Sequence, residues 1–357
     1  MTTAATAPIA TPQPANPKLA PVPPKAISRL AKATKGVLRH PTRYVIYGPE
    51  GVGKTTLAAD APGAILADIE DGSARVNVAR YPFRDDADGH VPRTYTEFLT
   101  CLEDLTMSEH SFKTFILDSI DRLESMIWRH MMERDSGKVT ASNPKGYKLH
   151  SVADYGYGKG FDVAVDEWRG LLVKLNRLRY RKQMEIILVG HAQIKTFKNP
   201  TGEDFDRYQP RANDKVAGLL KEWAEVTGFF RFEDIGGKIP GSESDRSKGV
   251  STGRRILHLK RDAAYDAKTR LNLPDEIEVM PENPWAPLAK AVDDGYQAIQ
   301  ELEAAISAEL ERIGDATLTT KVGAATKAAV EKNDSAALQR YLAAAKARQP
   351  NDESQAQ

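Results

Sequence analysis

The feature that most constrains this chain is a glycine-rich segment at residues 48–55, which reads GPEGVGKT. It fits the pattern G-x-x-x-x-G-K-[ST] in full, and it stands between an apolar segment, RYVIYG, and a segment of helical composition, TLAADA. Glycines let the backbone curl so that successive N–H groups point inward, and the lysine and threonine that follow suit the phosphates of ATP and a Mg²⁺ ion. A ligand-free turn between a strand and a helix is the alternative. The candidate nucleotide ligands are Gly48, Pro49, Glu50, Gly51, Val52, Gly53, Lys54, Thr55 and Thr56.

A second candidate element is the apolar segment TFILDS at residues 114–119, which ends in the carboxylate of Asp118. In phosphate-binding folds of this kind, such an aspartate helps to hold Mg²⁺ together with the hydroxyl of the loop threonine. Thr55 and Asp118 are therefore the expected metal ligands. A strand that simply ends in a helix-capping Asp118 or Ser119 is the alternative.

Short apolar segments alternate with helical ones through the first three quarters of the chain. Near-continuous apolar strands separated by helices predict an α/β fold whose mainly parallel sheet is covered by helices on both faces. The expected strands are 43–48, 64–70, 114–119, 185–191, 226–233 and 254–261, and the expected helices include 56–61, 94–105 and 162–178. The basic residues near the end of the last helix, from Lys174 to Lys182, are expected on its solvated face.

The 357 residues divide into four parts by composition. Residues 1–26 are rich in Ala, Pro and Thr and predict a disordered tail, and residues 348–357 are a second polar tail. Residues 27–284 hold the α/β pattern and form the expected ATPase domain. Residues 285–347, rich in Ala, Glu, Lys and Leu, predict two or three helices.

The C-terminal helices are expected to break at Gly314-Asp315 and again at residues 333–335, where Ser335 is a candidate cap. They could pack back on the core, pair between subunits, or dock a partner such as a single-strand-binding protein. No apolar run approaches the roughly 20 residues that span a bilayer. The chain has one cysteine, Cys101, and a net charge of +1. We therefore expect a cytoplasmic protein without a membrane partner.

The candidate general base follows the second strand, ILADIE. Ligands of open α/β sheets bind beyond the carboxyl ends of the strands, which is where Glu70 is expected to lie. Glu70 could therefore polarise the water that attacks the γ-phosphate. Asp68 is a rival one step deeper in the strand, and an exposed loop carboxylate is the alternative for Glu70.

On GPEGVGKT, ILADIE and FILDSIDRL, the chain resembles the RecA-like recombinase ATPases. The resemblance implies a RecA-like P-loop core in which Glu70 is the catalytic base. An ordinary AAA+ protein has a glutamate directly after the aspartate of the Mg²⁺ site, and Ser119 at that position counts against an AAA+ assignment. With the late stretch LKRD and KTRLNLP, the chain is also similar to phage-encoded RecA-like ATPases, which include Sak-type single-strand annealing proteins. This likeness covers roughly residues 42–282.

The resemblance also implies roles for three further residues. His191, at the end of IILVGH, corresponds to a γ-phosphate-sensing position at which RecA has a glutamine. Lys260 and Arg261 correspond to basic residues that reach the neighbouring subunit's ATP in RecA-type filaments. The alternatives are a strand-end histidine with a local hydrogen bond and a solvated basic strand end.

RecA-like recombinases hold single-stranded DNA on two loops, and both corresponding segments are long here. Residues 137–161 interleave lysines with aromatic residues, which suits a single strand because cations follow phosphates while rings stack on bases. Residues 195–215 are also basic, but their acids largely cancel that charge. An ordinary surface loop or a lid over ATP is the alternative for both. The candidate DNA contacts are Lys138, Lys145, Tyr147, Lys148, Tyr155, Tyr157, Lys159, Lys198, Arg207 and Arg211.

Taken together, the sequence predicts an ATP- and Mg²⁺-dependent ATPase that acts on single-stranded DNA in phage-type recombination or annealing. Its activity is expected to be stimulated by DNA, its assembly to be a homo-oligomeric filament or ring, and its location to be the bacterial host cytoplasm. One alternative is an ATP-driven helicase-like or loader motor. Another is a nucleotide-gated binding module with little turnover.

Overall fold

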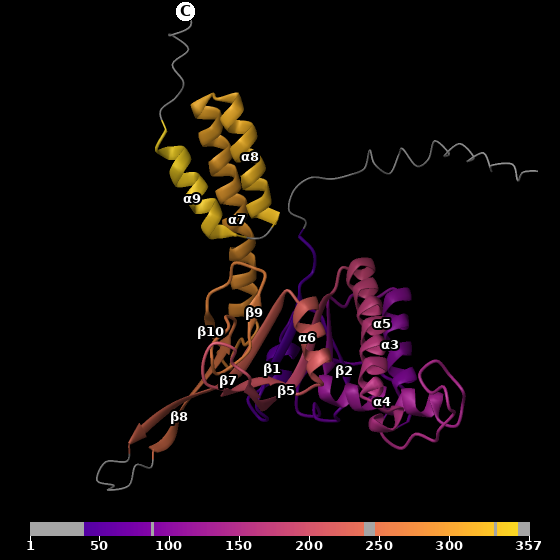
Figure 1. The fold of residues 1–357 in the computed structure, drawn as a ribbon. Coiled ribbons are helices and arrows are strands. Elements are labelled where there is room, and N and C mark those ends of the chain that lie inside the picture. The colour runs from indigo at the N-terminus through magenta and orange to yellow at the C-terminus, as the bar shows by residue number, and fades with distance from the viewer. Residues whose placement is uncertain (1–38, 87–88, 239–246, 332–333, 349–357) are drawn as a thin grey trace, which may run out of the picture. The chain divides into compact units, whose positions relative to one another are not determined.

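The computed structural model describes residues 39–86, 89–238, 247–331 and 334–348. The expected N-terminal tail, most of the lead-in that follows it, and nearly all of the C-terminal tail lie outside these residues. Within them, the chain forms the expected α/β core, a mostly parallel sheet between helices that is followed by C-terminal helices (Figure 1). This confirms the fold class predicted from the alternation of apolar strands and helices.

The strands of one sheet run in the order β10-β8-β7-β1-β5-β4-β2-β3. The strands from β7 to β3 pair in parallel, and β8, β9 and β10 join antiparallel at the β7 side. The parallel strands are β1 (Arg43–Gly48), β2 (Ala64–Asp68), β3 (Ala79–Arg80), β4 (Thr114–Asp118), β5 (Glu185–Phe197) and β7 (Val226–Lys238). The antiparallel ones are β8 (Ser247–His258), β9 (Lys268–Thr269) and β10 (Glu276–Glu278).

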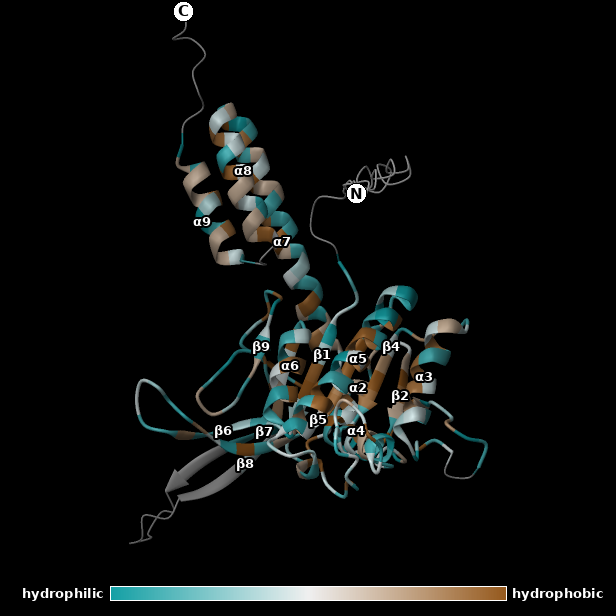
Figure 2. Cartoon of the chain, turned by 45° about the vertical axis from the view of Figure 1, so that its right-hand side comes forward, coloured by the Kyte–Doolittle hydropathy of each residue, from teal (hydrophilic) through white to brown (hydrophobic). Residues whose placement is uncertain are grey.

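Helices cover both faces of this sheet because successive strand residues point to opposite sides. Val45 of β1 packs in the cluster beneath the first group of helices, whereas Tyr44 and Ile46 pack in the cluster beneath the second. Figure 2 shows the hydrophobic colour gathered on the central strands between these layers. The first group is α3 (Tyr95–Met107), α4 (Ile120–Asp135), α5 (Lys159–Lys182) and α6 (Asp214–Trp223), and the second is α2 (Lys54–Ala59) with the start of α7 (Ala286–Ile313).

The register brings the carboxyl ends of four neighbouring strands to one edge of the sheet. Gly48 of β1 lies opposite His191 of β5, and Asp118 of β4 lies opposite Val189 of β5. Asp68 of β2 pairs with Asp118 in turn. β5 thus separates the strand that precedes the glycine-rich loop from the strand that ends in Asp118, and candidate site residues converge from all four strands.

The segment 195–215, expected to be an irregular loop, is mostly regular structure. β5 continues to Phe197 and pairs antiparallel with β6 (Phe205–Pro210), and α6 begins at Asp214. The expectation was wrong because the second half of β5 is exposed at every other residue and lacks the apolar run of a buried strand. A β-hairpin therefore extends from the carboxyl edge of the sheet.

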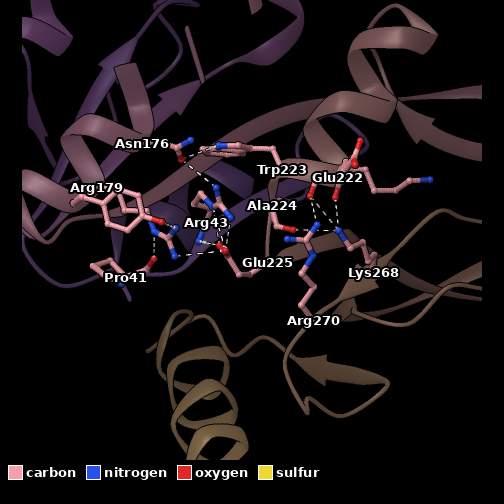
Figure 3. Close-up of polar contacts among 12 residues, drawn as sticks. Pro41, Arg43, Asn176, Arg179, Glu222, Trp223, Ala224, Glu225, Lys268 and Arg270 are labelled. Atoms are coloured by element: carbon pink, nitrogen blue, oxygen red, sulfur yellow. Dashed lines mark hydrogen bonds and ion pairs between the residues drawn. The ribbon is translucent and has the colours of Figure 1, made fainter. Parts of the chain in front are cut away.

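The opposite, amino edge of the sheet holds a cluster of charges (Figure 3). Glu225, just before β7, accepts hydrogen bonds from the Arg43 backbone N–H at 2.8 Å and from Arg43 Nε at 2.9 Å. Arg179 Nη2 lies 3.5 Å from the same carboxylate, and Asn176 accepts hydrogen bonds from Arg43 and Trp223 at 3.0 Å each. Arg179 is 4% exposed, so it leaves the solvated basic face on which it was expected.

Three helices follow the core: α7, α8 (Ala316–Glu331) and α9 (Ser335–Lys346). Their breaks lie where the sequence predicts them, but the cap of α9 is Asp334, whose side chain accepts from Ala337 N, rather than Ser335. The start of α7 is fixed to the core, because the Trp285 N–H donates to Asp60 at the end of α2 at 3.0 Å. No helix among the described residues is long and apolar enough to cross a bilayer.

Candidate functional site

The glycine-rich loop connects β1 to α2 at the carboxyl edge of the sheet. Gly51 and Gly53 have φ values of 74° and 99°, which L side chains rarely adopt, so these positions favour glycine. Lys54 begins α2, is 6% exposed, and donates from Nζ to the carbonyls of Gly48 and Pro49 at 3.0 and 2.8 Å. Its ammonium group thus lies across the mouth of the loop, where the sequence predicts the phosphates.

Gly48 is required for a different reason, the closeness of the neighbouring strand. A Cβ built on Gly48 would lie 1.9 Å from the carbonyl oxygen of Phe230 in β7. Real Cβ atoms do not approach backbone so closely, so any side chain here would push β1 and β7 apart. The pattern's first glycine thus sets the spacing of the two strands behind the loop.

Thr55 and Asp118 form the expected pair of metal ligands. The Thr55 hydroxyl donates to Asp118 Oδ2 at 2.5 Å. Burial raises the pKa of Asp118 to about 6, and the charges of Glu70 and Asp68 also act to raise it. A hydroxyl and a carboxylate in contact, among further carboxylates, form the hard-oxygen set that Mg²⁺ prefers, so these residues fit the ion.

Glu70 lies two residues beyond β2 and reaches the same place. The hydroxyl of Ser119 donates a hydrogen bond to Glu70 Oε1, and the Glu70 side chain keeps 28% of its surface exposed. The rival, Asp68, is 1% exposed and accepts hydrogen bonds from the backbone N–H and hydroxyl of Ser73. Asp68 therefore holds the loop after β2, whereas Glu70 faces the site.

His191 lies in β5 beside Glu70 and a carboxylate that sequence reasoning missed, Asp121. His191 Nδ1 is 3.1 Å from both oxygens of Asp121 and 3.6 Å from Glu70 Oε1. The hydrogen bond to Asp121 raises the pKa of His191 against the opposing effect of burial. Burial also acts to raise the pKa of Asp121, but His191 outweighs it and the pKa is lowered. The only signal for Asp121 in the sequence was its place in FILDSIDRL, in the first turn of α4.

Lys260 and Arg261 lie after β8 and away from the loop of their own chain. Lys260 is paired with Asp275 at 3.0 Å, and both side chains are largely exposed. Arg261 lies over the ring of Phe197 in the hairpin, at 6.0 Å. No contact of either residue with residues 48–56 appears in the described part of the chain.

The segment 137–161, between α4 and α5, presents most of its predicted DNA contacts to solvent. Tyr147 and Tyr157 are 55% and 104% exposed, and Lys145 lies over the Tyr147 ring at 5.8 Å. Tyr155 is an exception, because it is 8% exposed and its hydroxyl donates to the Met131 carbonyl at 2.9 Å. Tyr155 stabilises the segment from within and cannot stack on a base, which corrects that expectation. The exposed lysines are Lys138, Lys145, Lys148 and Lys159.

The hairpin of β5 and β6 presents fewer free cations. Lys198 is paired with Asp204 at 2.5 Å. Arg207 is 5% exposed, donates to the Ala263 carbonyl and lies over the Phe197 ring at 4.2 Å, so it cannot serve as the expected surface contact. Arg211 is turned toward the glycine-rich loop, where its Nη2 lies 3.3 Å from Glu50 Oε1.

Comparisons with known proteins identify one family that covers most of the chain. A family model described as an AAA domain (AAA_24) matches residues 40–271. No curated protein matches the chain. Among solved structures, the crystal structure of the RadB recombinase matches over 72% of this chain and 95% of its own, with 12% identity and a TM-score of 0.35, a level of likeness that carries no argument about function.

Ser119, the position at which an ordinary AAA+ protein has a glutamate, lies within the matched residues. In this chain, the Ser119 hydroxyl donates a hydrogen bond to Glu70, which lies two residues beyond β2. Because the match covers more than half of the residues, the chain belongs to the family of AAA domains.

Proposed function

We propose that the protein binds Mg²⁺ and ATP at residues 48–56 and hydrolyses the nucleotide. The observation that carries this proposal is the convergence of Lys54, Thr55, Asp118, Glu70 and His191 at the carboxyl ends of adjacent parallel strands. The position is where ligands bind to open α/β sheets. The catalytic domain would be residues 27–284, with residues 285–347 as an appendage.

The chain's own groups have distinct parts in this reaction. Lys54 and the loop N–H groups hold the phosphates, and Thr55 with Asp118 holds Mg²⁺, which would neutralise charge on the phosphate oxygens. Glu70 accepts the proton of the attacking water, and Ser119, through its hydrogen bond, fixes the orientation of that carboxylate. Asp121 holds His191 next to Glu70, where the ring can respond to the γ-phosphate.

His191 is also connected to the hairpin, which supports the proposal that nucleotide state is coupled to that element. The Arg211 N–H donates to the His191 carbonyl at 2.8 Å, and the Arg211 side chain reaches Glu50 of the loop. A change at either end of this connection would therefore shift the base of the β5–β6 hairpin. Coupling of this kind requires that the protein has two conformations with different affinities for the nucleotide.

We further propose that single-stranded DNA binds on the segment 137–161. Its four lysines have no carboxylate partner among the described residues, and its one acid, Asp154, accepts hydrogen bonds from the backbone of His150 and Ser151. Positive charge with the exposed rings of Tyr147 and Tyr157 fits a flexible anionic strand. The corresponding biological setting would be recombination or annealing of the phage type, by a homo-oligomer that could also contact a single-strand-binding protein.

Two other functions use the same site differently. A loader or helicase-like motor would hydrolyse ATP rapidly and translocate, with a protein or duplex partner on the long segments. A nucleotide-gated module would bind ATP with little turnover, and Glu70 would then be unimportant. The position of Glu70 beside Ser119 and His191 favours hydrolysis over the second of these.

The test is the ATPase rate with and without single-stranded DNA at two salt concentrations. We expect stimulation that weakens as salt rises, because binding to phosphates releases counterions. The double substitution Tyr147→Ala/Tyr157→Ala should weaken DNA binding at least about 30-fold, since two stacked bases contribute about 2 kcal/mol or more. Tyr180→Ala is the matched control, because Tyr180 is 50% exposed but lies on α5. A rate indifferent to DNA would favour the loader or the switch.

A further inference from the structure

One arginine beside the glycine-rich loop has no part in the site described so far. Arg255 lies in β8, whose partner β7 is next to β1. A Cβ built on Gly53 would lie 3.3 Å from Arg255 Nη1 and 3.7 Å from its Cζ. The guanidinium group therefore lies against the loop of its own chain, at the residue that precedes Lys54.

The Arg255 side chain has no hydrogen bond or ion pair with any described residue. Its Cζ lies 5.6 Å from the centre of the Phe232 ring, and the residue is half-buried. Its neighbour Arg254, by contrast, donates hydrogen bonds to both Glu233 and Glu278. Adjacent strand residues point to opposite faces, so two arginines of one strand have separate environments.

A half-buried cation that has no carboxylate partner among the described residues, and that lies beside a phosphate-binding loop, is placed to bind phosphate. The backbone N–H groups of such a loop surround the α- and β-phosphates, whereas the lysine reaches the β- and γ-phosphates. Lys54 extends toward Gly48 and Pro49, and Arg255 lies at Gly53. The two cations thus approach the phosphate chain from different ends of the loop.

We propose that Arg255 binds the α- or β-phosphate of the nucleotide in cis. This inference rests on the proposed nucleotide site and adds a ligand to it. Arginine can form two parallel hydrogen bonds to phosphate oxygens, and the planar group needs little rearrangement because Phe232 already supports it. Because ADP and ATP share these phosphates, Arg255 strengthens the binding of both and leaves the γ-phosphate chemistry to Lys54 and Glu70.

The experiment compares Arg255→Gln and Arg255→Ala with the control Arg254→Ala. Binding of fluorescent ADP and of a slowly hydrolysed ATP analogue is measured by titration, and the ATPase reaction supplies kcat and KM. We expect both Arg255 variants to bind both nucleotides about tenfold more weakly, with KM raised about tenfold and kcat unchanged. Arg255→Lys should recover part of the affinity, and thermal melting checks that each variant folds.

Each other outcome decides against the inference. Equal affinities in the Arg255 and Arg254 variants would mean that Arg255 only packs on Phe232. A lowered kcat with unchanged ADP affinity would place its action on the γ-phosphate and overturn the assignment to the α- or β-phosphate. Failure of the unmodified protein to bind either nucleotide would instead reject the proposed nucleotide site itself, a result that can be told apart from the first two.

Discussion

The two edges of the parallel sheet both hold charged side chains out of water, but they do so in different ways. At the amino edge, Glu225 lies between Arg43 and Arg179 and accepts hydrogen bonds from both (Figure 3). At the carboxyl edge, Asp118 and Glu70 face one buried cation, Lys54, and the histidine beside them is already paired with Asp121. The first cluster holds two guanidinium groups for one carboxylate, whereas the second has an excess of carboxylate.

The pKa values of Glu225 and Asp118 reflect this difference in charge. Burial acts to raise the pKa of Glu225, but the hydrogen bonds and charges of Arg43 and Arg179 outweigh it, and the pKa is lowered. Burial raises the pKa of Asp118 to about 6, and neighbouring carboxylates add to the effect. Carboxylates that repel one another at a cleft are a common property of functional sites. The comparison thus separates a cluster that stabilises the fold from one arranged for a ligand.

The largest effect should come from Lys54→Ala at the carboxyl edge. ATP turnover should fall by at least about 1000-fold, because the cation that holds the β- and γ-phosphates is lost. Burial lowers the pKa of Lys54, which means that the folded state holds its charged form at a cost. Removal of this side chain should therefore not reduce the melting temperature. The steady-state ATPase rate and thermal melting check the two statements. Lys290→Ala, which removes an exposed lysine of α7, is the control. Normal turnover in Lys54→Ala would mean that the site lies elsewhere.

Glu70→Gln should separate binding from chemistry. ATP should bind with an affinity within a few-fold of the unmodified protein, while kcat falls about 100- to 1000-fold because the general base is lost. Asp71→Asn is a close control, since Asp71 is exposed and paired with His90. Single-turnover ATP hydrolysis is the measurement. Full hydrolysis by Glu70→Gln would remove this residue from the mechanism.

Glu225→Ala should act on the fold rather than on the site. It leaves Arg43 and Arg179 buried without their carboxylate, which we expect to lower the free energy of unfolding by about 3 kcal/mol. Nucleotide affinity should stay unchanged at temperatures where the variant is folded. Denaturant unfolding and nucleotide titration test this, and a stable variant with weakened nucleotide binding would contradict the contrast between the two edges.

The smallest effect concerns pH in the absence of metal and nucleotide. Because the folded pKa of Asp118 is raised, the folded state binds the proton more tightly, and stability from this group is lost as pH rises from about 4 through about 6. Asp118→Asn should remove that loss, because the amide does not titrate. Glu225 has a lowered folded pKa, so its contribution is present above its ordinary value and is lost as pH falls through the folded pKa.

Unfolding curves measured from about pH 2 to pH 8 would show the two opposite slopes. The free energy of unfolding of the unmodified protein relative to Asp118→Asn should fall as pH rises from about 4 through about 6. The free energy of unfolding of the unmodified protein relative to Glu225→Ala should instead rise with pH, from the lowered folded pKa of Glu225 up to its ordinary value. Slopes of the same sign for the two variants would remove the electrostatic distinction between the edges.

The positions that sequence reasoning predicted best are those that follow from local pattern. The glycine-rich loop begins where the buried strand β1 ends, Asp118 ends the buried strand β4, and parallel pairing brings Glu70 to the same edge. Asp121 was missed because its partner, His191, is 70 residues away. Tyr155, Arg179 and Arg207 were expected at the surface because their burial depends on contacts with Met131, Glu225 and Phe197, which no local pattern reveals.

The attachment of α7 has a mechanical consequence. Its first turns pack on the core through Trp285, Leu288 and Val292, and its later buried residues belong to the part of the helix that contacts α8 and α9. A helix of 28 residues is about 40 Å long, and it behaves as a stiff rod. Since Trp285 is bonded to Asp60 at the end of the loop's own helix, a tilt of only about 10° at that pivot would swing the far end of α7 by about 7 Å.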